Sequence, residues 1–246
     1  RLFDRTTRSV HLTAAGQVFV EQARLLNTQT HEALQRVQHI TQLQSGKVSL
    51  AALPSLAATV VPRVMARFAR QYPDIALALH DTLSGPAFEL VRSGAVDFAL
   101  TAANPDYADL DYSPFSADGF VLLMPLDHPL AATLGPLSWL EVAGLSHISM
   151  PLPASVRQYA NAALMEHRLA FQPRYEVEHI ATIHALVKAG LGVAALPELA
   201  AAFVQQGGVV SRRLTAPDLQ RPIGVVTRRN RSLSPAAQEM VRLLRQ

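Results

Sequence analysis

Polar side chains recur where the apolar, strand-like runs of this sequence end. They are Pro54, Ser55, Thr101, Ser149, His179 and Thr182. In an open α/β sheet, ligands bind beyond the carboxyl ends of the strands, where amides of the next helix point into a cleft. Hydroxyl and imidazole groups there would hold a carboxylate or a polar neutral ligand without a fixed cation. The alternative is that Ser and Thr only cap helices and that His179 is a structural, hydrogen-bonded imidazole.

Three patterns that could indicate an enzyme or a metal site fail on context. The run from Gly190 to Ala195 matches G-x-G-x-x-A, but a helical pattern precedes it and a strand follows, the reverse of a dinucleotide site. The segment around Ser146 lacks the closing glycine of a nucleophile elbow. His179 and His184 are five residues apart, which is the wrong spacing for two ligands on one helix face. We therefore expect no catalytic group, no cofactor and no metal.

The elements that would position these side chains alternate between strand-like and helical patterns after residue 47. The strand-like runs are Lys47 to Leu53, Ile75 to His80, Asp97 to Thr101, Phe120 to Met124, Tyr175 to Glu178 and Val193 to Leu196. The helical patterns are Ala57 to Gln71, Ala87 to Arg92, Ser155 to Arg168, Ala181 to Ala189 and a last helix after Ser234. This order predicts an α/β fold with a mostly parallel sheet. Loop residues around 115–119 and 217–228 suggest that the chain crosses there between two lobes.

The first 46 residues follow a different pattern. Residues 1–12 predict a short hairpin, and Thr13 predicts a helix cap. The stretch from Ala14 to Leu43 contains no proline and carries a heptad seam of Phe19, Leu26, Ala33, Val37 and Ile40. A helix of this length spans about 45 Å and suits a dimerising rod. The alternative is a helix that lies on its own domain.

Charge separates the same two parts of the chain. The first 47 residues hold six basic and three acidic side chains, whereas the remaining 199 hold 16 of each. A basic tip suits a phosphate backbone, and a neutral body suits a small ligand. The alternative is a solvated, mildly basic surface.

Length and composition set the outer limits. A chain of 246 residues with 49% hydrophobic residues builds one large α/β unit or two lobes, and a disordered or fibrous chain is excluded. No run of about 18 uncharged apolar residues predicts a membrane span, and no signal-type segment opens the sequence, so we expect a cytoplasmic protein. Because the sequence starts with Arg1, we interpret it as a fragment that has lost its N-terminus.

Six segments, in order, resemble landmarks of the LysR-type transcriptional regulators. They are LFDRTTRSVHLTAAG at 2–16, YPD at 72–74, GAVDFAL at 94–100, DHPL at 127–130, VKAGLGVAALP at 187–197 and LSPAA at 233–237. The resemblance implies a remnant wing of a winged helix-turn-helix domain at 1–13, a linker and dimerisation helix at 14–46, and an effector-binding domain at 47–246. It further implies two Rossmann-like lobes, similar to type 2 periplasmic binding proteins. Lobe I would cover about 47–117 and 222–246, and lobe II about 118–221.

The resemblance also implies partners. Arg5 and Arg8 of the wing would contact DNA, and a small effector would bind between the lobes at Pro54, Ser55, Thr101, Ser149, His179 and Thr182. No Arg or Lys stands in those loops, so we expect a polar or weakly anionic effector. The regulator would be a cytoplasmic homodimer or homotetramer. An exported solute-binding protein of a transport system shares this architecture and is the alternative, although it needs neither the basic hairpin nor the heptad helix.

Overall fold

A computed structural model describes the chain except for residues 6–9 and 205–206. It divides into two compact units, Arg1–Gly46 and Lys47–Gln246. Within the described part of the chain, no helix is long and apolar enough to cross a membrane.

The first unit is a hairpin followed by a long helix. Strand β1 (Phe3–Arg5) pairs antiparallel with β2 (Val10–Leu12), and α1 covers Ala14–Thr41. The Thr13 hydroxyl accepts a hydrogen bond from the Gly16 amide at 3.0 Å, so the expected helix cap is confirmed. Arg8 lies outside the described residues. The contact of Arg5 and Arg8 with DNA stays a prediction.

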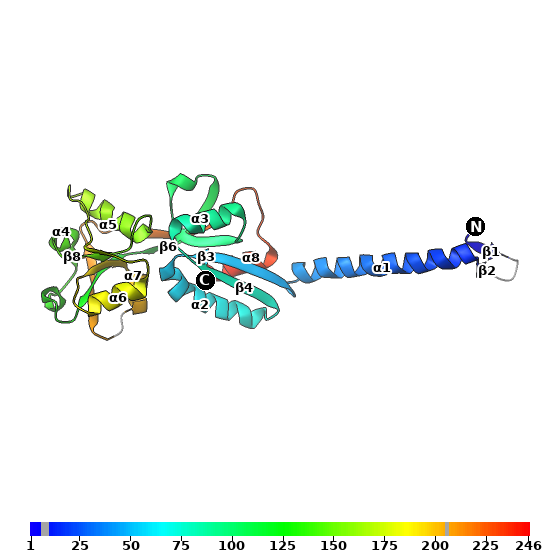
Figure 1. The fold of residues 1–246 in the computed structure, drawn as a ribbon, viewed down its shortest axis with the longest axis horizontal. Coiled ribbons are helices and arrows are strands. Elements are labelled where there is room, and N and C mark those ends of the chain that lie inside the picture. Colours follow the sequence, from blue (N-terminus) through cyan, green and yellow to red (C-terminus); the bar gives the residue numbers. More distant parts are fainter. Residues whose placement is uncertain (6–9, 205–206) are drawn as a thin grey trace. The chain divides into compact units, whose positions relative to one another are not determined.

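The second unit contains two α/β lobes, as expected (Figure 1). Lobe I consists of β3 (Gly46–Ala52), α2 (Pro54–Gln71), β4 (Ile75–Asp81), α3 (Ser84–Ser93), β5 (Phe98–Ala102), a 3-10 turn at Pro105–Tyr107, β6 (Leu110–Asp118), β13 (Arg221–Arg228) and α8 (Pro235–Leu244). Its sheet has the order β4-β3-β5-β13-β6. Helices α2 and α8 pack together on one face, and α3 packs on β5 and β13 at the other face (Figure 1). A core of buried apolar side chains such as Phe88, Val91 and Val226 fills the space beneath α3.

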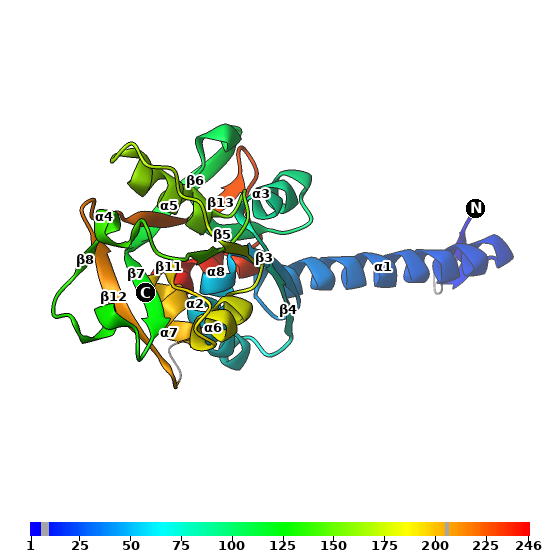
Figure 2. The same cartoon turned by 60° about the vertical axis from the view of Figure 1, so that its left-hand side comes forward.

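Lobe II is built around a second sheet. Its elements are β7 (Phe120–Pro125), a 3-10 turn at Pro129–Ala132, β8 (Leu137–Ser138), α4 (Trp139–Val142), β9 (Ile148–Ser149), α5 (Ser155–Met165), β10 (Tyr175–Glu176), α6 (Ile180–Lys188), β11 (Ala194–Pro197), α7 (Glu198–Val204) and β12 (Val209–Thr215). The main sheet has the order β11-β7-β12-β8, and β9 pairs with β10. The core contains Phe120, Leu122, Trp139 and Ile183. Helix α7 of this lobe packs beside α2 of lobe I (Figure 2).

The expectation of mostly parallel sheets is only partly right. Strands β3 and β5 are parallel, but β13 is antiparallel to both β5 and β6. The reason is topological, since β6 carries the chain out of lobe I and β13 brings it back beside β6. In lobe II, β7 likewise runs antiparallel to β11 and β12.

The chain crosses between the lobes twice, within the segments predicted for it. It leaves lobe I between β6 and β7, through Gly119, and returns between β12 and β13. The two crossing strands are in register, with Asp118 of β6 opposite Arg221 of β13. This register places a carboxylate and a guanidinium side by side at the junction of the lobes.

Candidate functional site

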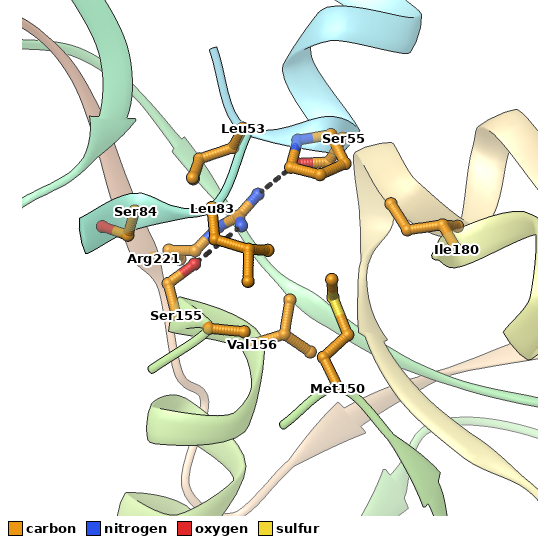
Figure 3. Close-up of a pocket in the computed structure, with 11 residues that line it drawn as sticks. Leu53, Ser55, Leu83, Ser84, Met150, Ser155, Val156, Ile180 and Arg221 are labelled. Carbon is orange, nitrogen blue, oxygen red and sulfur yellow. Dashed lines mark hydrogen bonds between the residues drawn. The ribbon is translucent and has the colours of Figure 1, made fainter. Parts of the chain in front are cut away.

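An inner pocket lies where helices of both lobes begin (Figure 3). Helices α2 and α3 of lobe I and α5 and α6 of lobe II all start there. The lining residues are Leu53, Pro54, Ser55, Leu83, Ser84, Met150, Ala154, Ser155, Val156, Ile180 and Arg221. The pocket holds about 20 Å³, which is room for roughly one water molecule.

None of these four helices has a side-chain cap. The N-cap residues of α2, α3 and α5 are Leu53, Leu83 and Ala154, whose side chains cannot accept a hydrogen bond, and His179 makes no cap bond at α6. The first turn of a helix leaves amide N–H groups without intrahelical partners and carries a partial positive charge. Four such ends directed at one pocket form a site for a negatively charged group.

A buried arginine completes the pocket. The Arg221 guanidinium donates to the Asp118 carboxylate at 2.7 Å, to the Ser55 hydroxyl at 3.0 Å and to the Ser155 hydroxyl at 3.3 Å. Burial lowers the pKa of Arg221 below its usual value, and Asp118 opposes that shift. Ser55 belongs to lobe I and Ser155 to lobe II, so this one side chain ties the lobes together, as Figure 3 shows.

One donor of Arg221 has no partner. Its side chain is 1% exposed, yet no hydrogen bond reaches Nε within the described part of the chain. An unsatisfied buried donor is costly, and it marks a position where a ligand acceptor would be favoured. The pocket therefore combines helix amides, serine hydroxyls and a free guanidinium N–H.

A second row of hydroxyls supports the pocket. Ser84, the first residue of α3, lies 3.0 Å from the Thr101 hydroxyl at the end of β5, and either can be the donor. Thr101 is fully buried behind Ser84 and is not one of the lining residues. Its contact with Ser84 fixes the Ser84 side chain at the pocket wall.

An outer cleft adjoins the inner pocket. It holds about 270 Å³ and is lined by Pro54, Ala58, Asp81, His179, Ile180 and Ala181. Pro54 and Ile180 line both spaces, so the two adjoin at these residues. Burial raises the pKa of Asp81 above its usual value, and the nearby charge of His179 opposes that shift.

The structure brings together only part of the predicted site. Pro54 and Ser55 line the inner pocket, and His179 lines the outer cleft. Ser149 is buried next to the lining residue Met150, and its hydroxyl has no hydrogen-bond partner among the described residues. Thr182 is exposed on the first turn of α6, outside the lining of both spaces.

Two expectations need correction. The alternative that these hydroxyls cap helices is wrong for Ser55, because the N-cap position of α2 is Leu53. The expectation of a site without a fixed cation is incomplete, because the predicted loops hold no Arg or Lys but Arg221 reaches the pocket from β13. Sequence reasoning missed Arg221, Ser155 and Ser84, although Ser155 opens a helix that the sequence predicted.

No group of three or more His, Asp or Glu side chains that could bind a metal occurs among the described residues. The polar groups of the cleft are instead hydroxyls, amides, one guanidinium and, at the mouth, one carboxylate and one imidazole. This set can bind and orient a small polar molecule.

Comparison with known proteins identifies the family. Residues 41–246 match the model of the LysR substrate binding domain. The chain belongs to the LysR family. It is 32% identical to an uncharacterized HTH-type transcriptional regulator, YbhD of Escherichia coli (strain K12), over 99% of this chain and 77% of that protein.

Solved structures agree on the fold. A full-length OxyR variant from Pseudomonas aeruginosa superimposes with a TM-score of 0.80 at 21% identity, covering 99% of this chain and 83% of that one. The effector binding domain of QuiR in complex with shikimate gives a TM-score of 0.73 at 18% identity, covering 81% and 95%. This LysR-type protein is therefore a transcriptional regulator, and the two-lobed fold inferred from the resemblance is confirmed. The comparisons do not support the transport alternative.

Proposed function

We propose that this LysR-type regulator senses a small molecule that carries a carboxylate, bound in the cleft between its two lobes. The observation that carries the proposal is the meeting of four uncapped helix starts at a pocket lined by Arg221. Each feature favours an anionic oxygen, and a pocket with helices from both lobes links that oxygen to the arrangement of the lobes. The effector class is thus more anionic than the sequence suggested.

Binding in this pocket is coupled to the separation of the lobes. The inner pocket admits about one water molecule, and the Arg221 bonds to Ser55 and Ser155 hold its walls together. A carboxylate has to part these groups on entry and then replaces their contacts with its own. The effector therefore favours one arrangement of the lobes over another, which is the condition for a ligand to shift a conformational equilibrium.

The first unit supplies the contacts with other chains in this proposal. The α1 side chains Phe19, Leu26 and Val37 are 57%, 64% and 59% exposed, and Ala33 is exposed beside them, so an apolar face is available for a second copy. The side chain of Ile40 lies outside the description. A homodimer or homotetramer would place the wing residues Arg5 and Arg8 of several copies on DNA. The protein acts in the cytoplasm as a regulator and not as an enzyme.

Titration of the chain with small acids tests the effector proposal. We expect one or more monocarboxylic acids to raise the melting temperature, while their neutral amides do not. Ser55→Ala weakens the response by about tenfold, because it removes a hydroxyl from the pocket wall and a partner of Arg221. Ser211→Ala on β12 is the matched control and leaves the response unchanged. If amides bind as well as acids, or Ser55→Ala titrates like the wild type, the site is assigned incorrectly.

A further inference from the structure

We propose that the effector is an aminocarboxylic acid, with its carboxylate in the inner pocket and its ammonium group at Asp81. This inference rests on the proposed function and adds the second end of the ligand. It comes from the different chemistry of the two adjoining spaces. The inner one offers donors, and the outer one offers an acceptor with a full negative charge.

The inner end selects a single carboxylate. Arg221 is buried and lines this space, and its Nε is without a partner among the described residues. The hydroxyls of Ser55, Ser84 and Ser155 and the starts of four helices surround it. Asp118 already balances the formal charge of Arg221 at 2.7 Å, so the interior is close to neutral before a ligand enters. One anionic group can enter there once the walls part, and it would be held mainly by hydrogen bonds and helix ends.

The outer end selects a cation. Asp81 is the last residue of β4 and lines the outer cleft. Its carboxylate takes part in none of the ion pairs or side-chain hydrogen bonds found among the described residues. The Asp81 side chain is exposed at the cleft, and partial desolvation there raises its pKa, so its charge is accessible to a ligand. An ammonium group on the ligand would supply the missing counter-charge.

The positions of the two spaces set the order of the groups along the ligand. Pro54 and Ile180 line both the inner pocket and the outer cleft, so a molecule that bridges the two spaces would extend from Arg221 past these two residues to Asp81. A dicarboxylic acid would bring a second negative charge beside Asp81, which is unfavourable. His179 lines the same cleft, and its charge interaction with Asp81 opposes the rise in the pKa of that carboxyl.

Calorimetric titration of the chain with matched probes tests this assignment. The probes are the protein amino acids and the ω-amino acids from 3-aminopropanoate to 6-aminohexanoate, each paired with the acid that lacks the amine and with its amide. We expect at least one aminocarboxylic acid to bind at least tenfold more tightly than both partners of its set. Asp81→Asn abolishes the preference over the deaminated acid. Asp74→Asn, which changes the exposed carboxylate before the same strand, preserves it.

The outcomes separate this inference from the proposed function. If deaminated acids bind as tightly as amino acids, and Asp81→Asn binds both alike, the ammonium site is wrong and the carboxylate site stands. If dicarboxylic acids bind most tightly, the charge argument for the outer cleft is wrong. If no acid of either kind binds, both the inference and the carboxylate site are overturned. Retention of the amine preference in Asp81→Asn would also overturn the inference, because the cation would then lie elsewhere.

Discussion

Polar groups at the cleft and polar groups elsewhere in this LysR-type regulator are satisfied in different ways. Away from the cleft, α1, α4 and α8 begin with a side-chain cap, at Thr13, Ser138 and Ser234. Around the cleft, α2, α3, α5 and α6 begin without one. A cap typically stabilises a helix by about 1 kcal/mol. At the four helix starts without a cap, a ligand can supply the missing hydrogen-bond acceptor and so stabilise the protein when it binds.

Ion pairs show the same contrast. Arg213 pairs with Asp218 at 3.1 Å on the surface, where both side chains are about half exposed. Arg221 pairs with Asp118 at 2.7 Å with both side chains 1% exposed. The first pair is solvated. In the second pair, each buried side chain relies on the other to balance its charge. The cleft therefore holds the polar contacts whose loss matters most.

Arg221→Met tests this contrast with the largest expected effect. Removal of the guanidinium leaves Asp118 buried without a counter-charge, and such a change destabilises a protein by about 3–5 kcal/mol. Urea denaturation followed by circular dichroism measures the free energy of unfolding. Arg213→Met is the matched control and should cost at most about 1 kcal/mol. Equal losses in the two variants would show that the buried pair is no different from the surface pair.

Replacing both partners sharpens the same test. In Arg221→Met with Asp118→Leu no buried charge remains, so we expect the double variant to recover a large part of the lost stability. Its response to acids should stay absent, because Arg221 lines the pocket. A double variant that is less stable than Arg221→Met would indicate that the cost comes from packing.

Sequence rules predicted the parts of the site that depend on neighbouring residues. Pro54 and Ser55 follow a buried strand directly. Because ligands in an α/β sheet bind beyond the carboxyl ends of strands, this position predicted that they lie at the cleft. Thr182 obeyed the same rule, but α6 already begins at Ile180, and a residue two positions later does not share the face of the first. The rule identifies a helix start and does not say which side chain faces the pocket.

Arg221 could not be placed from the sequence because its position depends on long-range pairing. It contacts Ser55 across 166 residues and lies opposite Asp118 only through the register of β13 on β6. That register is set where the chain returns from lobe II, and it includes an irregularity between Ile223 and Gly224. The two-lobed fold could be inferred from the order of the strand-like and helical segments and from the family resemblance. The charged pair inside the cleft could be found only from the pairing of β13 with β6.

Ala154→Ser should convert one bare helix end into a capped one. The new hydroxyl would accept from a first-turn amide of α5, so we expect the ligand-free protein to gain about 0.5–1 kcal/mol. The same hydroxyl competes with a ligand carboxylate for that amide, so affinity for the best-binding acid should fall. Ser234→Ala at α8 is the reverse control, with a loss of about 1 kcal/mol and no change in affinity. A stabilised Ala154→Ser with unchanged affinity would contradict a ligand role for the α5 amides.

Asp81→Asn should give the smallest effect, and its sign depends on pH. Burial raises the pKa of Asp81 in the folded protein, so the charged form is disfavoured on folding and destabilises the protein at neutral pH. This cost is present above the folded pKa and disappears as the pH falls below the unfolded value of about 4. The variant should therefore unfold at a slightly higher temperature than the wild type at pH 7, and the difference should shrink towards pH 4.5.

Asp74→Asn provides the matched control, because that exposed carboxylate precedes the same strand and lies outside the cleft lining. Melting curves of both variants across this pH range, without added acid, measure the effect. If Asp81→Asn lowers the melting temperature at pH 7, the charge is already balanced in the ligand-free protein. The contrast between the cleft and the rest of the molecule would then rest on Arg221 and the helix starts alone.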